Sequence, residues 1–247
     1  MRIDARANDA CRKIEITPDF APNADGSVLI ACGNTRVICT AVFVPGVPSF
    51  KIGSGEGWLT AEYAMLPAST PGRKSRETLR PDGRSVEIRR LIGRCMRAAV
   101  DLKALGENTL YLDCDVVQAD GGTRTTSITG SFIAAALACD ALLSRGAIEH
   151  AFIRDALAAI SVGICQGEPL LDLCYEEDSH AQVDMNVVML GGEYVEVQGT
   201  AEHGVFSPLQ LQQMLDLAAK GIGEIMQIQC EMLRGKTYLI QEGVHAR

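Results

Sequence analysis

The chain has 247 residues, of which 47% are hydrophobic and 22% charged; this composition excludes an intrinsically disordered chain, a collagen and a coiled coil. A chain of this length can bury a full hydrophobic core, so it needs neither disulfides nor a structural metal to fold. The net charge of −8 argues at first against a nucleic-acid partner.

The charge is unevenly distributed along the chain. Residues 73–103 contain ten of the 23 basic residues and four acidic ones, whereas residues 104–202 contain three basic and sixteen acidic residues. A clustered basic segment is typical of a face that binds a polyanion. A solvated helix face together with an exposed loop explains the same cluster equally well.

No targeting or membrane segment is predicted. The chain has no run of about 18 uncharged apolar residues, and its N-terminus lacks the apolar core of a signal peptide. The nine cysteines are scattered singly without a CxxC pair, which is typical of reduced, mostly buried thiols. We therefore expect a cytoplasmic protein without a membrane partner.

The first half of the chain alternates strand and helix patterns. Short β-rich segments are expected over 14–44, with Gly33-Asn34 as a hairpin turn. Residues 45–86 look mostly like loop, with one strand over 58–66. Apolar residues at helical spacing predict an amphipathic helix over 86–102, and a strand follows over 109–118.

The second half of the chain also contains both helix and strand patterns. A helix that is apolar nearly all round is predicted over 131–143, and such a helix must be buried. The remaining elements are strands over 157–165, 169–175, 184–190 and 193–198, with Gly191-Gly192 as a hairpin turn, and a helix from Ser207-Pro208 to about residue 234. Hairpins mixed with helices favour an α+β fold over a doubly wound sheet.

The segment 120–127, Asp-Gly-Gly-Thr-Arg-Thr-Thr-Ser, carries the first chemical signal. Its two glycines allow a tight turn and close approach to a ligand. The open N–H groups at the following helix start, with several hydroxyls and the guanidinium of Arg124, would cradle a phosphate or carboxylate. The alternative is a well-capped helix start without a ligand.

The second signal is acidic. Glu176, Glu177, Asp178 and Asp184 fall within nine residues, in a predicted turn between two strands. Carboxylates held together repel one another unless they share a cation, so Asp178 and Asp184 are candidate ligands for Mg²⁺ or Mn²⁺. A solvated acidic loop is the simpler interpretation of this segment alone.

These blocks together resemble the ribonuclease PH family of phosphate-dependent 3′-to-5′ exoribonucleases, which trim tRNA 3′ ends. The similarity runs from about residue 2 to about residue 230 and includes GEGWLTAEYAMLP, DCDVVQADGGTRTTSITG and LLDLCYEEDSHAQVDMNVVM. It implies one domain over 1–247 with the ribosomal protein S5 domain 2-like fold, in which mixed sheets pack against helices. The phosphate cradle would lie within about 1–140, and the acidic turn and the long helix within about 150–240.

The resemblance also implies site residues. Inorganic phosphate, the co-substrate, would be bound by Arg84, Gly122, Thr123, Arg124 and Thr125. The catalytic residues would be Arg84, Arg124, Asp178 and Asp184, the last two also holding the metal. The RNA would be held by Arg73, Arg76, Arg90 and Arg97. The sequence departs from the family pattern at two places in the expected tRNA-binding segment. Ala68 stands where the family usually has an arginine, and the loop before Arg84 is about two residues shorter than usual.

The implied reaction is attack of inorganic phosphate on the last phosphodiester of an RNA, which releases a nucleoside diphosphate. The step should be reversible as nucleotidyl addition, because a phosphodiester is exchanged for a phosphoanhydride. The family implies a hexameric ring, a trimer of dimers. Three alternatives remain open: a catalytically silent RNA-binding ring subunit, a metal-dependent hydrolytic nuclease, and a small-molecule kinase on a related fold.

Overall fold

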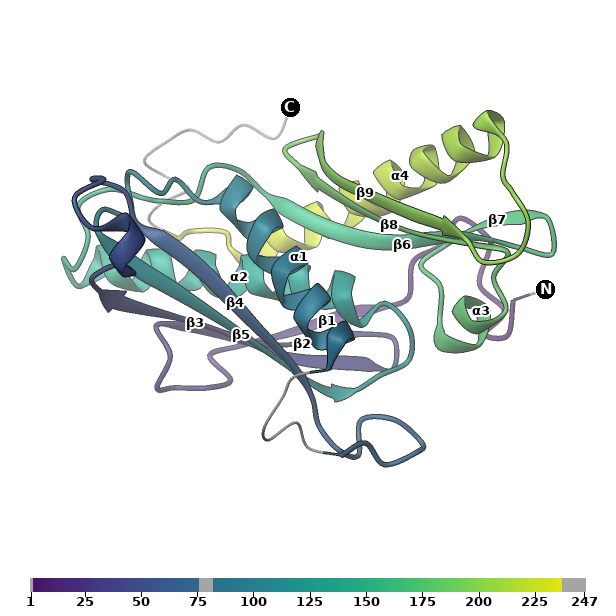
Figure 1. Ribbon diagram of the computed structural model, residues 1–247, viewed down its shortest axis with the longest axis horizontal. Helices are drawn as coiled ribbons and strands as arrows, with labels where there is room; N and C mark the ends of the chain where they lie inside the picture. Colours follow the sequence, from purple (N-terminus) through teal and green to yellow (C-terminus); the bar gives the residue numbers. More distant parts are fainter. Residues whose placement is uncertain (1, 76–81, 237–247) are drawn as a thin grey trace.

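The computed structural model describes residues 2–75 and 82–236, which form two β-sheets and their covering helices (Figure 1). The first sheet has the strand order β1-β2-β3-β5-β4 and is antiparallel except for the parallel pair β4 and β5. Its strands are β1 (Ile14–Pro18), β2 (Gly26–Cys32), β3 (Thr35–Pro45), β4 (Trp58–Met65) and β5 (Asn108–Gln118). The predicted α+β class is confirmed.

The second sheet is antiparallel throughout, in the order β7-β6-β8-β9. Its strands are β6 (Leu157–Cys165), β7 (Glu168–Leu171), β8 (Val183–Leu190) and β9 (Glu193–Ala201). Both hairpin turns predicted from glycines are confirmed, since Cys32 pairs with Thr35 across Gly33-Asn34 and Leu190 pairs with Glu193 across Gly191-Gly192.

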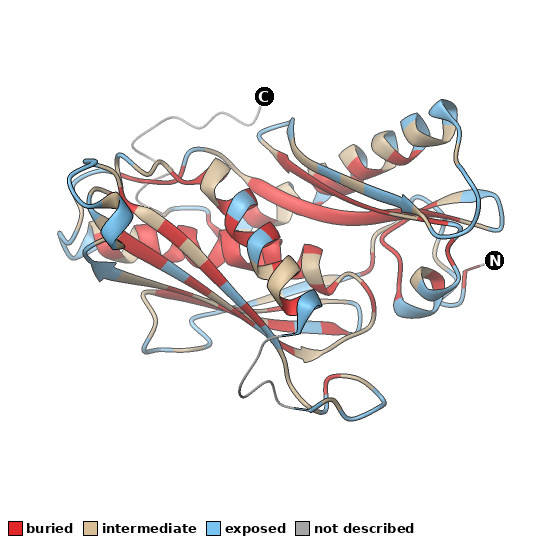
Figure 2. Cartoon of the chain, viewed as in Figure 1, coloured by how far each residue is buried: buried red, intermediate tan, exposed pale blue. Residues whose placement is uncertain are grey.

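The helices are α1 (Gly83–Ala99), α2 (Thr123–Ser144), α3 (Tyr175–Ser179) and α4 (Pro208–Met232), with a 3₁₀ turn over Ser49–Lys51. Helix α2 contacts β2 and β3 of the first sheet and β6 of the second, so one helix is packed against both sheets. Figure 2 shows it buried along most of its length. By length and composition α2 could cross a membrane, but 83% of its most apolar window is buried inside the fold, as expected for a core helix.

Helix α1 is amphipathic as predicted. Ile88, Leu91 and Ile92 are buried against the first sheet, whereas Arg90 and Arg94 are exposed. The helix begins three residues earlier than the predicted start at 86, because the Asp82 carboxylate accepts a hydrogen bond from the Ser85 N–H and caps it.

Three expectations in the second half need correction. The helix predicted over 131–143 begins at Thr123, eight residues earlier, so the hydroxyl-rich segment after Gly122 forms its first turns. The strand predicted over 169–175 ends at Leu171, because Asp172 adopts a positive φ of 55° and its carboxylate is bound by Arg12. The acidic segment predicted as a turn forms the short helix α3. By contrast, Ser207 caps α4 as predicted, with Pro208 at its first position.

Candidate active site

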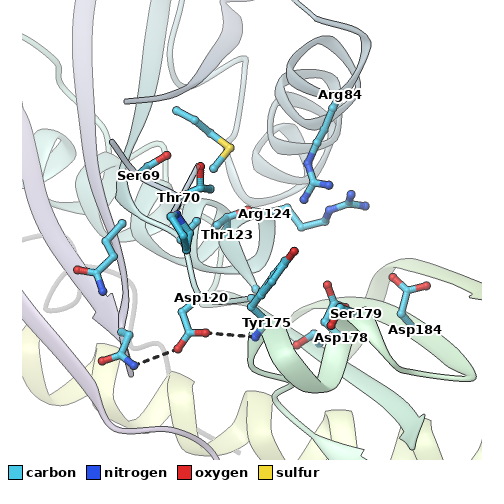
Figure 3. A pocket seen from close by; sticks show the side chains of 18 of the residues that line it. Ser69, Thr70, Arg84, Asp120, Thr123, Arg124, Tyr175, Asp178, Ser179 and Asp184 are labelled. Atoms are coloured by element: carbon cyan, nitrogen blue, oxygen red, sulfur yellow. Dashed lines mark hydrogen bonds between the residues drawn. The ribbon is translucent and has the colours of Figure 1, made fainter. Parts of the chain in front are cut away.

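A pocket of about 1300 Å³ opens between the start of α1, the β5–α2 loop, α3 and the beginning of β8 (Figure 3). These segments are far apart in the sequence, and they come from both sheets. Of the residues proposed from the sequence, those that line the pocket are Arg84, Gly122, Thr123, Arg124, Asp178 and Asp184. The structure therefore brings the predicted cradle and the predicted acidic pair to one cavity.

The cradle is built from backbone geometry that requires glycine. Gly121 and Gly122 have φ values of 74° and 66°. A Cβ on Gly121 would lie 2.6 Å from the carbonyl oxygen of Leu173 and 2.7 Å from the Tyr175 nitrogen, so any side chain there would push the loop away from α3. The glycines thus hold the cradle against the segment that carries the acidic residues.

Helix α2 begins at Thr123 and leaves N–H groups open toward the pocket. The first helical hydrogen bond runs from Thr126 N–H to the Gly122 carbonyl. Among the described residues, the N–H groups of Thr123, Arg124 and Thr125 have no acceptor, and no side chain caps the helix. Open N–H groups at the positive end of a buried helix favour a bound anion.

The two threonine hydroxyls are already engaged within the fold. Thr123 Oγ1 accepts from the Tyr63 hydroxyl at 3.0 Å, and Thr125 Oγ1 donates to the Gly122 carbonyl at 2.9 Å. Thr125 does not line the pocket. Its proposed part in anion binding is therefore limited to its backbone N–H.

Two guanidinium groups face the same space from different helices (Figure 3). Arg84 is exposed on the first turn of α1 and has no hydrogen-bond or ion-pair partner within 2–75 and 82–236. Arg124 lies 3.6 Å from the Glu87 carboxylate and 3.4 Å from Gln198 Oε1. Two such groups converging on one cavity provide charge for an anion with several oxygens.

Asp178 on α3 and Asp184 on β8 form the acidic side of the pocket. Burial raises the pKa of Asp178, the charge of Asp184 raises it further, and the guanidinium groups of Arg124 and Arg84 oppose the rise. Burial and the charge of Glu202 likewise raise the pKa of Asp184. Burial and neighbouring negative charge disfavour the ionised forms of this carboxylate pair, and a bound cation would stabilise them.

The donor set suits a hard divalent cation held by few protein ligands. Oxygen donors suit Mg²⁺ and Mn²⁺. No group of three or more His, Cys, Asp or Glu side chains able to hold a metal occurs in the part of the chain that the structure describes. Asp178 and Asp184 would therefore bind such an ion together with water and the substrate.

The other carboxylates of the acidic segment have different roles. Glu177 is buried and accepts two hydrogen bonds from the Arg2 guanidinium, at 2.8 and 2.7 Å. Glu176 is exposed. The four-carboxylate cluster inferred from the sequence is thus reduced to the pair that faces the pocket.

The proposed RNA-binding arginines lie in different surroundings. Arg73 and Arg90 are exposed, in the loop after β4 and on α1. Arg97 is half-buried, where its guanidinium donates to the Leu59 carbonyl at 3.0 Å and lies 5.0 Å from the Trp58 ring centroid. This geometry favours a packing role for Arg97. Arg76 lies outside the described residues.

Sequence reasoning missed an arginine cluster at the N-terminus, formed by Arg2, Arg6 and Arg12. Arg12 is bound through its Nε and Nη2 to the Asp172 carboxylate, at 2.9 and 2.7 Å, and its Nη1 donates to the Asp120 carbonyl. The cluster therefore ties the β5–α2 loop to the segment preceding α3. No local pattern in the first thirteen residues distinguishes these arginines from solvated ones.

Asp120 and Tyr175 were also missed as pocket residues. The Asp120 carboxylate accepts from Asn34 Nδ2 at 3.1 Å and from the Tyr175 N–H at 3.3 Å. These bonds connect the β2–β3 turn, the cradle and α3 (Figure 3).

Two family models match this chain, and both describe domains of the same family. Residues 10–139 match the model of the 3′ exoribonuclease family, domain 1, and residues 155–221 match domain 2 of the same family. Together these matches cover most of the chain.

Curated relatives are similar over nearly the whole length. The ribonuclease PH of Corynebacterium kroppenstedtii is 55% identical, with 94% of this chain and 93% of the relative covered. That of Syntrophomonas wolfei is 54% identical, with 92% and 97% covered.

Solved structures share the fold at low identity. Rice Rrp46 has a TM-score of 0.76 at 18% identity, with 94% of this chain and all of that chain covered. A chain of the Archaeoglobus fulgidus exosome with RNA bound to the active site has a TM-score of 0.77 at 23% identity, with 92% of each chain covered.

Proposed function

Because the chain belongs to the 3′ exoribonuclease family that includes ribonuclease PH, we propose that it is a phosphorolytic exoribonuclease that trims tRNA 3′ ends. It removes the terminal nucleotide as a nucleoside 5′-diphosphate, and in reverse it acts as a tRNA nucleotidyltransferase. The mechanism rests on one observation: the anion cradle and a half-buried pair of carboxylates line the same pocket.

The first task of the site is to bring two anions together. Inorganic phosphate is held by the guanidinium groups of Arg84 and Arg124 and by the open N–H groups of Thr123 to Thr125. Positive charge on both sides of the phosphate offsets its repulsion from the RNA backbone and aligns it for in-line attack. The same donors stabilise the equatorial oxygens as negative charge redistributes in the transition state.

The second task is to support the departing RNA. Asp178 and Asp184 would hold a Mg²⁺ or Mn²⁺ ion, and such an ion would supply positive charge near the leaving 3′ oxygen. These carboxylates lie across the pocket from the cradle, so the scissile phosphodiester fits between the two.

RNA is held through its backbone by the basic surface of α1 and by the loop between β4 and α1, including Arg90 and Arg73. Contacts of this kind do not select a base sequence and weaken steeply with salt. We propose that the chain assembles into a hexameric ring built as a trimer of dimers; its fold is shared with chains of archaeal exosomes, which are assemblies of several chains.

The test uses a 3′-extended tRNA and Mg²⁺, with and without inorganic phosphate, and identifies the released nucleotide by chromatography. Nucleoside diphosphates that appear only with phosphate are the expected result. Nucleoside monophosphates released without phosphate would instead identify a hydrolytic nuclease. Binding of tRNA without release would identify a silent ring subunit, in which Asp184→Asn would change nothing.

A further inference from the structure

Tyr175 is an exposed aromatic ring in a pocket lined mostly by polar and small side chains. It is the only Phe, Tyr or Trp among the described residues that line the pocket, to which His203 adds an imidazole, and 61% of Tyr175 is exposed. Figure 3 shows its ring rising from α3, with Asp120 on one side and Asp178 and Ser179 on the other. The ring therefore fills no core and has a free face in the cavity.

The backbone beneath this ring is firmly held. The Tyr175 N–H donates to Asp120 Oδ1 at 3.3 Å, and Asp120 is itself fixed by Asn34. Gly121 packs so closely that a Cβ there would lie 2.7 Å from the Tyr175 nitrogen. The middle of α3 is fixed by the buried ion pair between Glu177 and Arg2. The backbone of Tyr175 thus has a fixed position relative to the cradle, so binding of a base has to order only the side-chain rotamer.

Two other aromatic rings of the first sheet, those of Tyr63 and Trp58, are engaged within the fold. Tyr63 is 4% exposed, and its hydroxyl is bound to Thr123. Trp58 packs edge-on against Phe50 and carries the Arg97 guanidinium on its ring. No hydrogen-bond partner for the Tyr175 hydroxyl occurs in the described ranges, so the ring is not held for a structural purpose.

We propose that Tyr175 is a base-stacking subsite, on which the terminal base of the RNA and the base of the released nucleoside diphosphate lie. A volume of about 1300 Å³ accommodates a whole nucleotide beside the phosphate. Stacking on an aromatic face is tolerant of base identity because every base presents a π-face. This subsite rests on the proposed function and extends it from the phosphate to the nucleoside.

The experiment removes each partner of the stack separately. Tyr175→Ala and Tyr175→Phe are compared with native protein on two RNAs that differ only in having a terminal adenosine or a terminal abasic ribose. Tyr111→Ala is the matched control, since Tyr111 is 41% exposed on β5 and does not line the pocket. Thermal denaturation of each variant establishes that the fold is retained.

On native protein, removal of the terminal base is expected to raise the RNA KM about tenfold. Tyr175→Ala should raise the KM for the RNA with a terminal adenosine by about the same factor. It should leave the KM for the abasic RNA nearly unchanged. Tyr175→Phe and Tyr111→Ala behave as native, and the phosphate KM is unchanged throughout. An equal loss on both RNAs, or a raised phosphate KM, overturns the proposal because Tyr175 would then act without the base.

A binding measurement separates failure of the subsite from failure of the proposed function. Calorimetry compares ADP with ribose 5-diphosphate on native protein and on Tyr175→Ala, without turnover. If native protein releases no diphosphate, the proposed function fails, while a preference for ADP that disappears in Tyr175→Ala still supports the base subsite. Absence of that preference in native protein refutes the subsite whatever the activity.

Discussion

Asp172→Asn probes the ion pair that joins the N-terminal arginine cluster to the site. The side chains of Asp172 and Arg12 are 4% and 5% exposed. The carboxylate accepts three hydrogen bonds from Arg12, from its backbone N, Nε and Nη2 at 2.7, 2.9 and 2.7 Å, and Arg6 lies 3.4 Å away. An asparagine keeps the shape but removes the charge, and its NH₂ group places a donor against a guanidinium that only donates.

The cost follows from leaving a guanidinium buried without a counter-charge. Breaking a buried pair in this way costs about 3–5 kcal/mol. For a chain of this size, each kcal/mol lowers Tm by about 2–4 °C, so Asp172→Asn should lower Tm by about 6–20 °C. Denaturation is compared at one protein concentration, because any assembly makes Tm concentration-dependent. The control is Glu176→Gln, an exposed carboxylate of α3 that should change stability by less than about 0.5 kcal/mol.

The pH dependence provides a second check on the same pair. Burial alone would raise the pKa of Asp172, but the hydrogen bonds and charge of Arg12 outweigh burial and hold the pKa below its usual value. A depressed pKa in the folded state adds stability above the unfolded-state pKa of about 3.9, and this stability disappears as pH falls through the folded-state pKa. The Tm difference between native protein and Asp172→Asn should therefore be constant near neutrality and shrink below about pH 4. A loss under 1 kcal/mol at pH 7, or a difference unchanged at acid pH, would refute the reasoning.

Three further predictions concern the pocket. Asp184→Asn should lower phosphorolysis about 10²–10³-fold and abolish the rise in Tm that Mg²⁺ gives native protein; it should not lower the metal-free Tm, because burial and Glu202 already disfavour the Asp184 charge. A thermal shift series with and without Mg²⁺ measures both effects, and a retained Mg²⁺ shift would contradict the metal assignment. Arg84→Ala should raise the phosphate KM about 10–100-fold, since a hydrogen bond to a charged group is worth about 1.5–3 kcal/mol; an unchanged phosphate KM in saturation kinetics would remove Arg84 from the cradle. Glu87→Gln should lower the phosphate KM by up to about fivefold, because Glu87 lies 3.6 Å from the Arg124 guanidinium and competes for it; a raised phosphate KM would show instead that Glu87 positions Arg124.

The local chemistry of the sequence predicted those parts of the site that depend on neighbouring residues. The Gly-Gly pair before a run of hydroxyl residues predicted an anion cradle at a helix start, and Gly122 does precede the first turn of α2 in a left-handed conformation. Ser207-Pro208 predicted the start of α4 because capping is decided within one turn. The apolar spacing of α1 depends equally on local periodicity.

Features that depend on distant partners were not predictable in this way. Residues 169–175 form a mostly apolar run typical of a strand, yet Asp172 leaves the sheet because Arg12, 160 residues earlier, binds its carboxylate. Glu177 is one of four carboxylates in the acidic segment, and only the fold shows that it is bound by Arg2. Tyr175 carries no chemical signal of its own, and its importance comes from the cavity around it.

The long reach of these ion pairs has a consequence for biosynthesis. Arg2 and Arg12 leave the ribosome early, but their partners Glu177 and Asp172 follow 175 and 160 residues later. At a synthesis rate of about 5–20 residues per second, the N-terminal arginines stay without these partners for roughly ten to thirty seconds. The core of the first sheet also includes Val188 and Leu233, so neither this core nor the pocket is complete, and the chain cannot act on RNA, before the second half is made.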